Sequence, residues 1–194
     1  MGLTARLRRA SLWRLLAMLL LPLLAVAQGW DEALYKQIEQ SIRMPQFPDR
    51  EYVITKYGAS EKATAAKNQK AINAAISDCS KRGGGHVVVP RGLWMTGAIR
   101  LQSGVNLVVE EGATLKFAFD PKLYPLVKTS WEGLGCWNYS PCIYAYQAKD
   151  VALTGKGTVD GNGSNDTWWP MCGKEEYGFV KGKTTEAQNL GSRA

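Results

Sequence analysis

The stretch that decides the fold class is HVVVPRGLWMTGAIRLQSGVNLVVEEGATLKFAF, residues 86–119. Runs of three to six β-favouring residues alternate there with turn residues, at 87–89, 98–101, 105–109 and 114–119. Neither two-residue hairpin signals nor crossover helices separate these runs. Very short strands joined only by turns favour a β-solenoid, in which each coil buries its apolar face against the next coil. A β-sandwich also contains short strands, and periodicity alone does not separate the two folds.

An amphipathic helix is expected directly before this stretch, over residues 64–81. Thr64 is a suitable N-cap residue, and the glycines 83–85 end the helix. Its apolar positions recur at helical spacing and form one stripe: Ala71, Ile72, Ala75, Ile76 and Cys79. A shorter helix is expected over 31–42, and a short strand over 52–55.

After residue 119 the pattern predicts a long aromatic loop over 120–141. The β pattern then resumes at 143–146 and 151–154 and continues to residue 163. The polar residues 164–194 provide no capping element, although a solenoid needs terminal caps and about three repeats or more. We therefore expect the chain to be part of a longer β-helix.

The first 27 residues have the composition of a signal peptide. They contain four arginines, no acidic residue and the apolar run LLAMLLLPLLAVA at 15–27, which ends in the small-x-small pattern of a cleavage site. This run is shorter than the about 20 residues that span a bilayer. We expect export to the periplasm or medium, with no stable membrane span after cleavage; an uncleaved anchor is the alternative. The expected organisation is 1–27 signal peptide, 28–49 helix and linker, and 50–194 part of a β-helix domain.

Charge and metal-ligating residues exclude several functions. The formal net charge is +7, but residues 1–27 hold four arginines and no acid, so the rest of the chain carries only +3. Nucleic-acid binding therefore loses its main support. The chain has one histidine and no Cys-x-x-Cys pair, which argues against a metal cluster, and no cofactor is expected. Cys136 and Cys142 are close enough in sequence for a disulfide loop, although four cysteines allow three pairings.

The order of the motifs resembles glycoside hydrolase family 28, the polygalacturonases, over about residues 50–173. The matching blocks are YGA at 57–59, GGGHVVVP at 83–90, GAIRL at 97–101, EGATL at 111–115, WEG at 131–133, NYSP at 138–141 and TGKGTVDGNG at 154–163, followed by Trp168-Trp169. The resemblance implies an all-β fold, a right-handed single-stranded parallel β-helix of the pectin-lyase-like type, with N-terminal coils and a capping α-helix. It also implies hydrolysis of α-1,4-galacturonan in pectin, an acidic polysaccharide, with inversion by two carboxyl groups.

The motifs that carry the family's chemistry are missing from this sequence. The family uses Asn-Thr-Asp, Asp-Asp, Gly-His-Gly and Arg-Ile-Lys motifs, and none of them occurs here. No catalytic residue can therefore be assigned, and we expect the 194-residue chain to be inactive alone. The alternatives are a pectate-lyase-like β-helix and a non-catalytic polysaccharide-binding or adhesin β-helix.

Aromatic residues in the later loops are the candidates for binding sugar. Flat aromatic rings contact the apolar faces of sugars. The candidates are Trp131, Glu132, Tyr139, Trp168 and Trp169. For each of them, packing within a loop is the competing interpretation. Neighbouring residues of an extended segment face opposite ways, so we expect one of Trp168 and Trp169 to pack in the core.

Overall fold

The structure is a computed structural model that describes residues 31–172. The chain divides into two compact units, Met1–Met44 and Pro45–Ala194. In the first unit, helix α2 (Glu32–Ser41) is capped by Asp31, whose Oδ1 accepts from the Leu34 amide at 3.0 Å. The helix expected over 31–42 is confirmed. The predicted signal peptide lies outside the described residues, and within residues 31–172 no helix is long and apolar enough to cross a bilayer.

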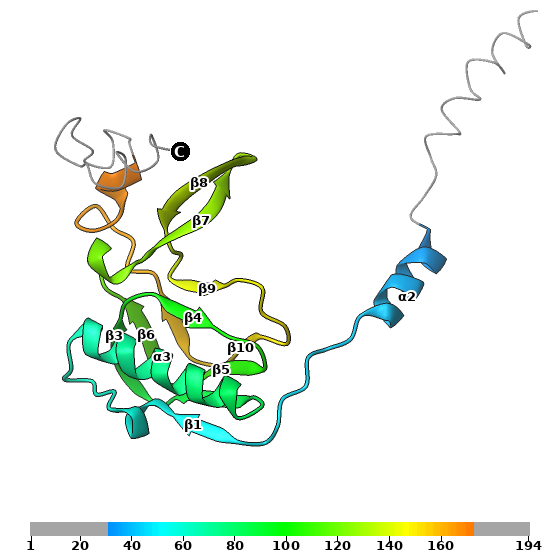
Figure 1. The fold of residues 1–194 in the computed structure, drawn as a ribbon, viewed down its shortest axis with the longest axis horizontal. Coiled ribbons are helices and arrows are strands. Elements are labelled where there is room, and N and C mark those ends of the chain that lie inside the picture. Colours follow the sequence, from blue (N-terminus) through cyan, green and yellow to red (C-terminus); the bar gives the residue numbers. More distant parts are fainter. Residues whose placement is uncertain (1–30, 173–194) are drawn as a thin grey trace, which may run out of the picture. The chain divides into compact units, whose positions relative to one another are not determined.

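The second unit winds its strands into successive coils (Figure 1). The first coil contains β2 (Gly85–Val89), β3 (Gly92–Thr96) and β4 (Ile99–Leu101). The second contains β5 (Val105–Val109), β6 (Ala113–Phe117) and β9 (Ile143–Ala145), and the third begins with β10 (Ala152–Gly155) and β11 (Thr158–Asp160). A further strand, β1 (Glu51–Val53), pairs with β2 and precedes the first coil.

Corresponding strands of successive coils pair in parallel and form three sheets. We call them sheet A (β1-β2-β5-β10), sheet B (β3-β6-β11) and sheet C (β4-β9). His86 pairs with Asn106, so one uninterrupted coil takes 20 residues. The expected parallel β-helix is confirmed. Strand β3 was missed by the sequence analysis because GLWMT does not alternate between apolar and polar residues.

The core lies inside the coils, where apolar side chains of successive strands stack in register. In sheet A, Val87 lies beside Leu107, and in sheet B, Trp94 lies beside Leu115; all four are at least 96% buried. Such stacking is the only way a short strand can bury its inner face, because each strand has few neighbours within its own coil.

Helix α3 (Ala65–Lys81) covers the open end of the first coil. Thr64 is its N-cap, and its side chain accepts from the Lys67 amide at 3.4 Å. The predicted apolar stripe is buried as expected, together with one polar residue that the sequence analysis did not include: Ala71, Ile72, Ala75, Ile76, Cys79 and Asn68. The helix predicted over 64–81 is therefore confirmed, and its buried face forms the end of the core.

Side chains before and within α3 satisfy the free edge of the first coil. Glu61 accepts from the Leu93 amide at 2.8 Å, and Asn68 donates to the Met95 carbonyl at 2.9 Å, so both pair with β3. Asn73 pairs with β4 in the same way: its Oδ1 accepts from the Arg100 amide at 2.9 Å. An open strand edge invites pairing with another chain. Here polar side chains replace the strands of a preceding coil.

The expectation of a loop over 120–141 is wrong in part, because an antiparallel hairpin forms there. It follows a short helix, η2 (Pro121–Leu123), and consists of β7 (Leu126–Trp131) and β8 (Leu134–Tyr139). The two turn residues, Glu132 and Gly133, have φ angles of 49° and 85°. This is the pattern of a type I′ turn, for which Asn-Gly and Asp-Gly are the usual signals. Because glutamate occupies the first turn position here, the usual signal is missing from the sequence and the hairpin was not predicted.

Candidate functional site

The outer face of sheet C is the part of the molecule best suited to bind a ligand. Because side chains alternate along a strand, Arg100 projects outward between the buried Ile99 and Leu101. Two hollows flank it. The hairpin hollow, of about 400 Å³, lies between α3, β4 and the base of the β7–β8 hairpin. The corner hollow, of about 350 Å³, lies between the end of α3 and the turns that follow β4 and β9.

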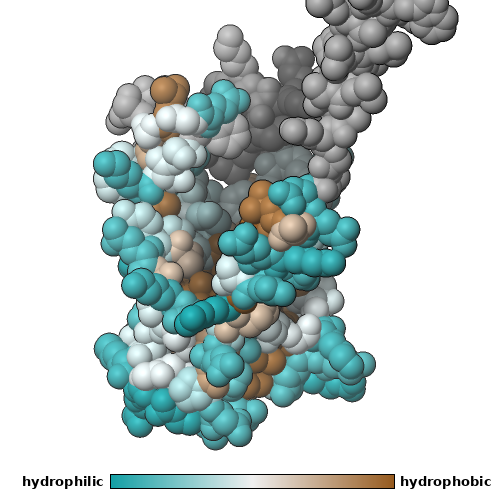
Figure 2. Space-filling model, turned by 90° about the vertical axis from the view of Figure 1, so that its right-hand side faces the viewer, coloured by the Kyte–Doolittle hydropathy of each residue, from teal (hydrophilic) through white to brown (hydrophobic). Residues whose placement is uncertain are grey.

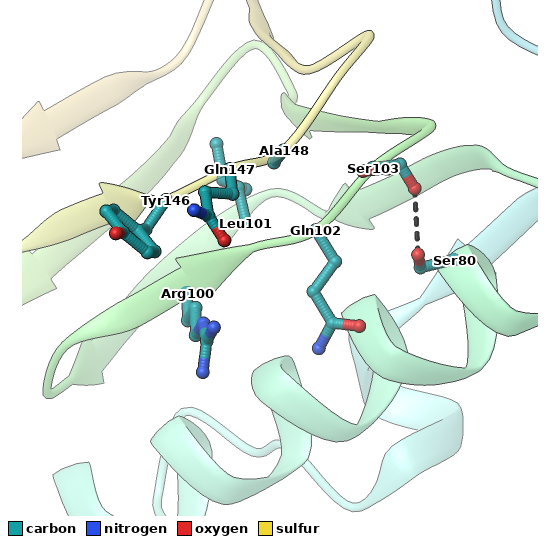
Figure 3. A pocket seen from close by; sticks show the side chains of 8 residues that line it. All are labelled: Ser80, Arg100, Leu101, Gln102, Ser103, Tyr146, Gln147 and Ala148. Atoms are coloured by element: carbon teal, nitrogen blue, oxygen red, sulfur yellow. Dashed lines mark hydrogen bonds between the residues drawn. The ribbon is translucent and has the colours of Figure 1, made fainter.

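Arg100 and Gln102 line both hollows and therefore join them into one surface. Figure 3 shows both side chains pointing from the β4 segment toward α3, while Tyr146 lies on the neighbouring β9 segment. At the far end of the corner hollow, the Ser80 hydroxyl donates to the Ser103 carbonyl at 2.8 Å. The side of the molecule shown in Figure 2 is mainly hydrophilic, with apolar side chains in small separate groups.

A cation and two aromatic rings stand together on this face. Arg100 is the register partner of Tyr144, and its Cζ lies 6.0 Å from the centre of the Tyr144 ring. The rings of Tyr144 and Tyr146 are nearly parallel, with centroids 6.5 Å apart and an interplanar angle of 8°. Among the described residues, Arg100 has no carboxylate partner. A guanidinium pairs well with a carboxylate, and aromatic rings contact sugar faces.

Two amide side chains of α3 hold Arg100 in place. Asn73 accepts from the Arg100 amide and donates to the Ala98 carbonyl at 3.1 Å. Gln69 donates to the same Ala98 carbonyl at 3.1 Å and to the Leu123 carbonyl at 2.6 Å. These bonds fix the start of β4 relative to α3 and to the segment before the hairpin. The two hollows together, which we call the sheet C groove, are therefore built on a backbone that these hydrogen bonds hold in place.

Four groups with shifted pKa values, Cys79, Tyr57, Asp78 and Asp160, line neither hollow and have structural surroundings. Burial raises the pKa of Cys79 to about 11 and that of Tyr57 to about 12. In Asp78, a hydrogen bond from the Tyr57 hydroxyl and then one from Arg82 lower the carboxyl pKa. In Asp160, the Asn162 amide and then Lys116 do the same. The Asn162 amide donates to Asp160 at 2.7 Å, so the Asp160 side chain caps the turn that follows β11.

The five candidate residues from the sequence do not come together on the sheet C face. Glu132 is exposed in the hairpin turn, and Trp131 ends strand β7 beside it. Tyr139, at the base of the hairpin, packs partly against the core. Glu132, Tyr139, Trp168 and Trp169 line neither hollow, and the role of all five candidates in substrate binding stays a prediction.

Trp168 and Trp169 differ as expected for neighbouring residues. The Trp168 ring packs edge-on against Phe119 and Tyr124, with centroid distances of 4.9 and 5.2 Å. Trp169, in the short helix η3 (Trp169–Cys172), is 45% exposed. The expectation that one of the pair packs in the core is confirmed, and Trp168 is the residue that does so.

Sequence reasoning missed the residues that the structure gathers on sheet C: Arg100, Gln102, Tyr144 and Tyr146. Signals for three of these four positions were present. Arginine between isoleucine and leucine in a short strand must face outward, and the two tyrosines of IYAY share one face. What the sequence did not show is that these segments, 44 residues apart, are register partners.

In this structure no disulfide joins Cys136 and Cys142, the pair considered from the sequence. Among the described residues, Cys79, Cys136 and Cys142 all carry free thiols. Cys136 lies three residues inside β8, about 10 Å from the end of the strand. Cys142 instead packs against the core, where burial raises the pKa of its thiol. No group of three potential metal ligands occurs within residues 31–172.

Known polygalacturonases resemble this chain in sequence and structure. No family model matches the chain. It is 32% identical over 121 residues to a probable polygalacturonase of Vitis vinifera, which covers 57% of this chain and 24% of that protein. A solved structure of a hyperthermoactive exopolygalacturonase from Thermotoga maritima superimposes with a TM-score of 0.74 and 36% identity, covering 84% of this chain and 36% of that one. A family 28 exopolygalacturonase of Yersinia enterocolitica gives a TM-score of 0.53 and 27% identity, covering 60% and 21%.

These similarities confirm the resemblance inferred from the motifs and the right-handed β-helix. The chain spans only 24% of the length of the Vitis vinifera protein and 36% of that of the Thermotoga maritima enzyme.

Proposed function

We propose that the chain is the N-terminal part of an exported glycoside hydrolase that cleaves α-1,4-galacturonan in pectin. The observation that carries this proposal is the match to an exopolygalacturonase along 84% of the chain, at a TM-score of 0.74. The proposed reaction is hydrolysis with inversion, in which one carboxyl group protonates the leaving oxygen and a second activates water. Neither group is assigned to residues 1–194, because the family's catalytic motifs are missing from this sequence.

Within such an enzyme, this chain would contribute the first coils and the beginning of a polymer-binding groove along sheet C. Within residues 31–172 the positive charge of Arg100 has no ion-pair partner, and each galacturonate unit carries one carboxylate. Tyr144 and Tyr146 offer ring faces at the same place. Strands of further coils would extend sheet C beyond β9, so that one continuous face could hold several sugar units.

The proposed organisation assigns residues 1–27 to a signal peptide, 28–49 to a helix and linker, and 50–194 to the β-helix domain. The basic stretch and the apolar run of residues 1–27 support export. The boundary near residue 50 is supported by β1, the first strand to pair with the coils, which starts at Glu51.

The test compares two products of the same gene. The product of the longest reading frame through codon 194 should release reducing ends from polygalacturonate. Residues 28–194 alone should release none. A product that absorbs in the ultraviolet through a new double bond would instead show elimination by a lyase. Binding without turnover by the longest product would support a non-catalytic protein and overturn the proposal.

A further inference from the structure

We propose that the hairpin hollow binds a single uronate residue, with Arg100 pairing its carboxylate, Tyr144 contacting its ring and Ser140 bonding one of its hydroxyls. The choice of a uronate rests on the proposed function. The existence of a small-molecule site rests on the hollow itself, whose volume of about 400 Å³ falls within the about 300–1,000 Å³ usual for such sites.

Ser140 provides the observation that points to a ligand. It lines the hairpin hollow and is only 6% exposed, yet its hydroxyl has no hydrogen-bond partner among the described residues. Its backbone is held in place, because the Ser140 amide donates to the Pro125 carbonyl at 2.8 Å. Buried hydroxyls are nearly always paired, and an unpaired one is costly. A ligand hydroxyl in the hollow would supply the missing partner.

The charge in the hollow selects an anion. Among the described residues that line it, Arg100 is the only charged one. In the described part of the chain the guanidinium makes no ion pair and lies beside the Tyr144 ring instead. A carboxylate bound there would meet no opposing negative charge from the lining residues. Pairing with arginine can be bidentate, which fixes the orientation as well as the sign of the ligand.

The remaining lining is largely apolar and suits the face of a sugar ring. Leu126 and Val127 line the hollow from the hairpin, and Tyr144 lines it from β9. The amide nitrogens of Gln69 and Asn73 donate to the backbone carbonyls of Ala98 and Leu123, and the Asn73 oxygen accepts from the Arg100 amide. The other polar lining residues, Ser140, Arg100 and Gln102, remain to meet the ligand. One carboxylate, several hydroxyls and an apolar ring face are the chemical features of a hexuronate.

The experiment measures the binding of galacturonate and digalacturonate to the full 194-residue chain by calorimetry or by NMR titration. Two variants remove one contact each, Arg100→Gln and Ser140→Ala. We expect Arg100→Gln to raise Kd at least about tenfold, because a charge-assisted bond is lost. Ser140→Ala should raise Kd about threefold to tenfold. Neutral galactose should bind the wild type as weakly as galacturonate binds Arg100→Gln.

The matched control is Arg91→Gln, which makes the same charge change in the turn between β2 and β3, away from the hollow. Its Kd should equal that of the wild type. Ser140→Ala should melt at the wild-type temperature or above it, because it deletes a buried hydroxyl without a partner. Weaker binding without weaker folding separates a ligand contact from a structural role.

An unchanged Kd in Arg100→Gln, or equal binding of galactose and galacturonate, would overturn the inference. Its failure is distinguishable from failure of the proposed function. If the longest gene product hydrolyses polygalacturonate but the two variants bind uronate normally, only the site assignment is wrong. If the chain binds uronate through Arg100 but the longest product has no hydrolase activity, only the proposed function is wrong.

Discussion

Replacing Asn68 by alanine should destabilise the first coil more than any surface change on α3. Asn68 is fully buried, and its side chain makes three hydrogen bonds: it accepts from the Ser60 amide at 2.9 Å and donates to the carbonyls of Ser60 at 3.0 Å and Met95 at 2.9 Å. At about 1 kcal/mol for each bond, the free energy of unfolding should fall by about 3 kcal/mol. For a domain of this size, the melting temperature should then fall by about 6–12 °C.

The assay is thermal and urea denaturation of the full chain, followed by circular dichroism. Lys70→Ala is the matched control, because Lys70 lies exposed on the same helix and its loss should change stability by less than about 0.5 kcal/mol. Asn68→Asp gives a second signature: it keeps the acceptor for Ser60 but loses both donors and buries a carboxyl group. Since burial raises the pKa of such a group, this variant should recover stability as the pH is lowered. The reasoning is refuted if Asn68→Ala melts within 2 °C of Lys70→Ala.

Three further changes test other parts of the same framework. Asn73→Ala should lower the free energy of unfolding by about 2 kcal/mol in urea denaturation, because the edge of β4 loses the donor and the acceptor that Asn73 presents to it; an effect below about 0.5 kcal/mol would contradict this. Two hydrogen bonds, the larger effect from the Tyr57 hydroxyl and the smaller from the Arg82 guanidinium, lower the pKa of the Asp78 carboxyl from its ordinary 3.8. The ionised Asp78 carboxylate therefore contributes its full stabilisation above pH 3.8, and this contribution is lost as the pH falls through the lower pKa of the folded state. Asp78→Asn lacks this contribution, so its melting temperature should fall less between pH 5 and pH 2 than that of the wild type. Parallel curves for the two proteins would refute the link. Gly155→Ala should lower the free energy of unfolding by at least about 1 kcal/mol, because Gly155 has a φ of 105° and a methyl group would collide with a backbone carbonyl of β5. Gly161→Ala, where nothing lies within 4 Å, should melt like the wild type, and equal losses in both variants would exclude the steric explanation.

The sequence by itself determined the elements whose signals are local. Helix α3 could be predicted with its cap and its buried stripe, because an amphipathic helix repeats its apolar positions within a single turn or two. The coil strands β2, β5 and β6 could be placed within two residues because turn residues bound them. The resemblance to polygalacturonases also depends on sequence alone, since it is carried by the order of short motifs.

Only the tertiary structure decided what depends on distant pairing. The polar side chains that replace a preceding coil, such as Asn68 and Asn73, have no signal in the sequence, because the strand groups that they pair with, on Met95 and Arg100, are each 27 residues away. The sheet C groove has the same origin. Arg100 meets Tyr144 only because residues 118–142 leave the coil as an inserted hairpin segment and return to it in register. The amino-acid pattern fixes which face of each short strand is apolar, whereas the path of the chain between strands decides which outward faces become neighbours.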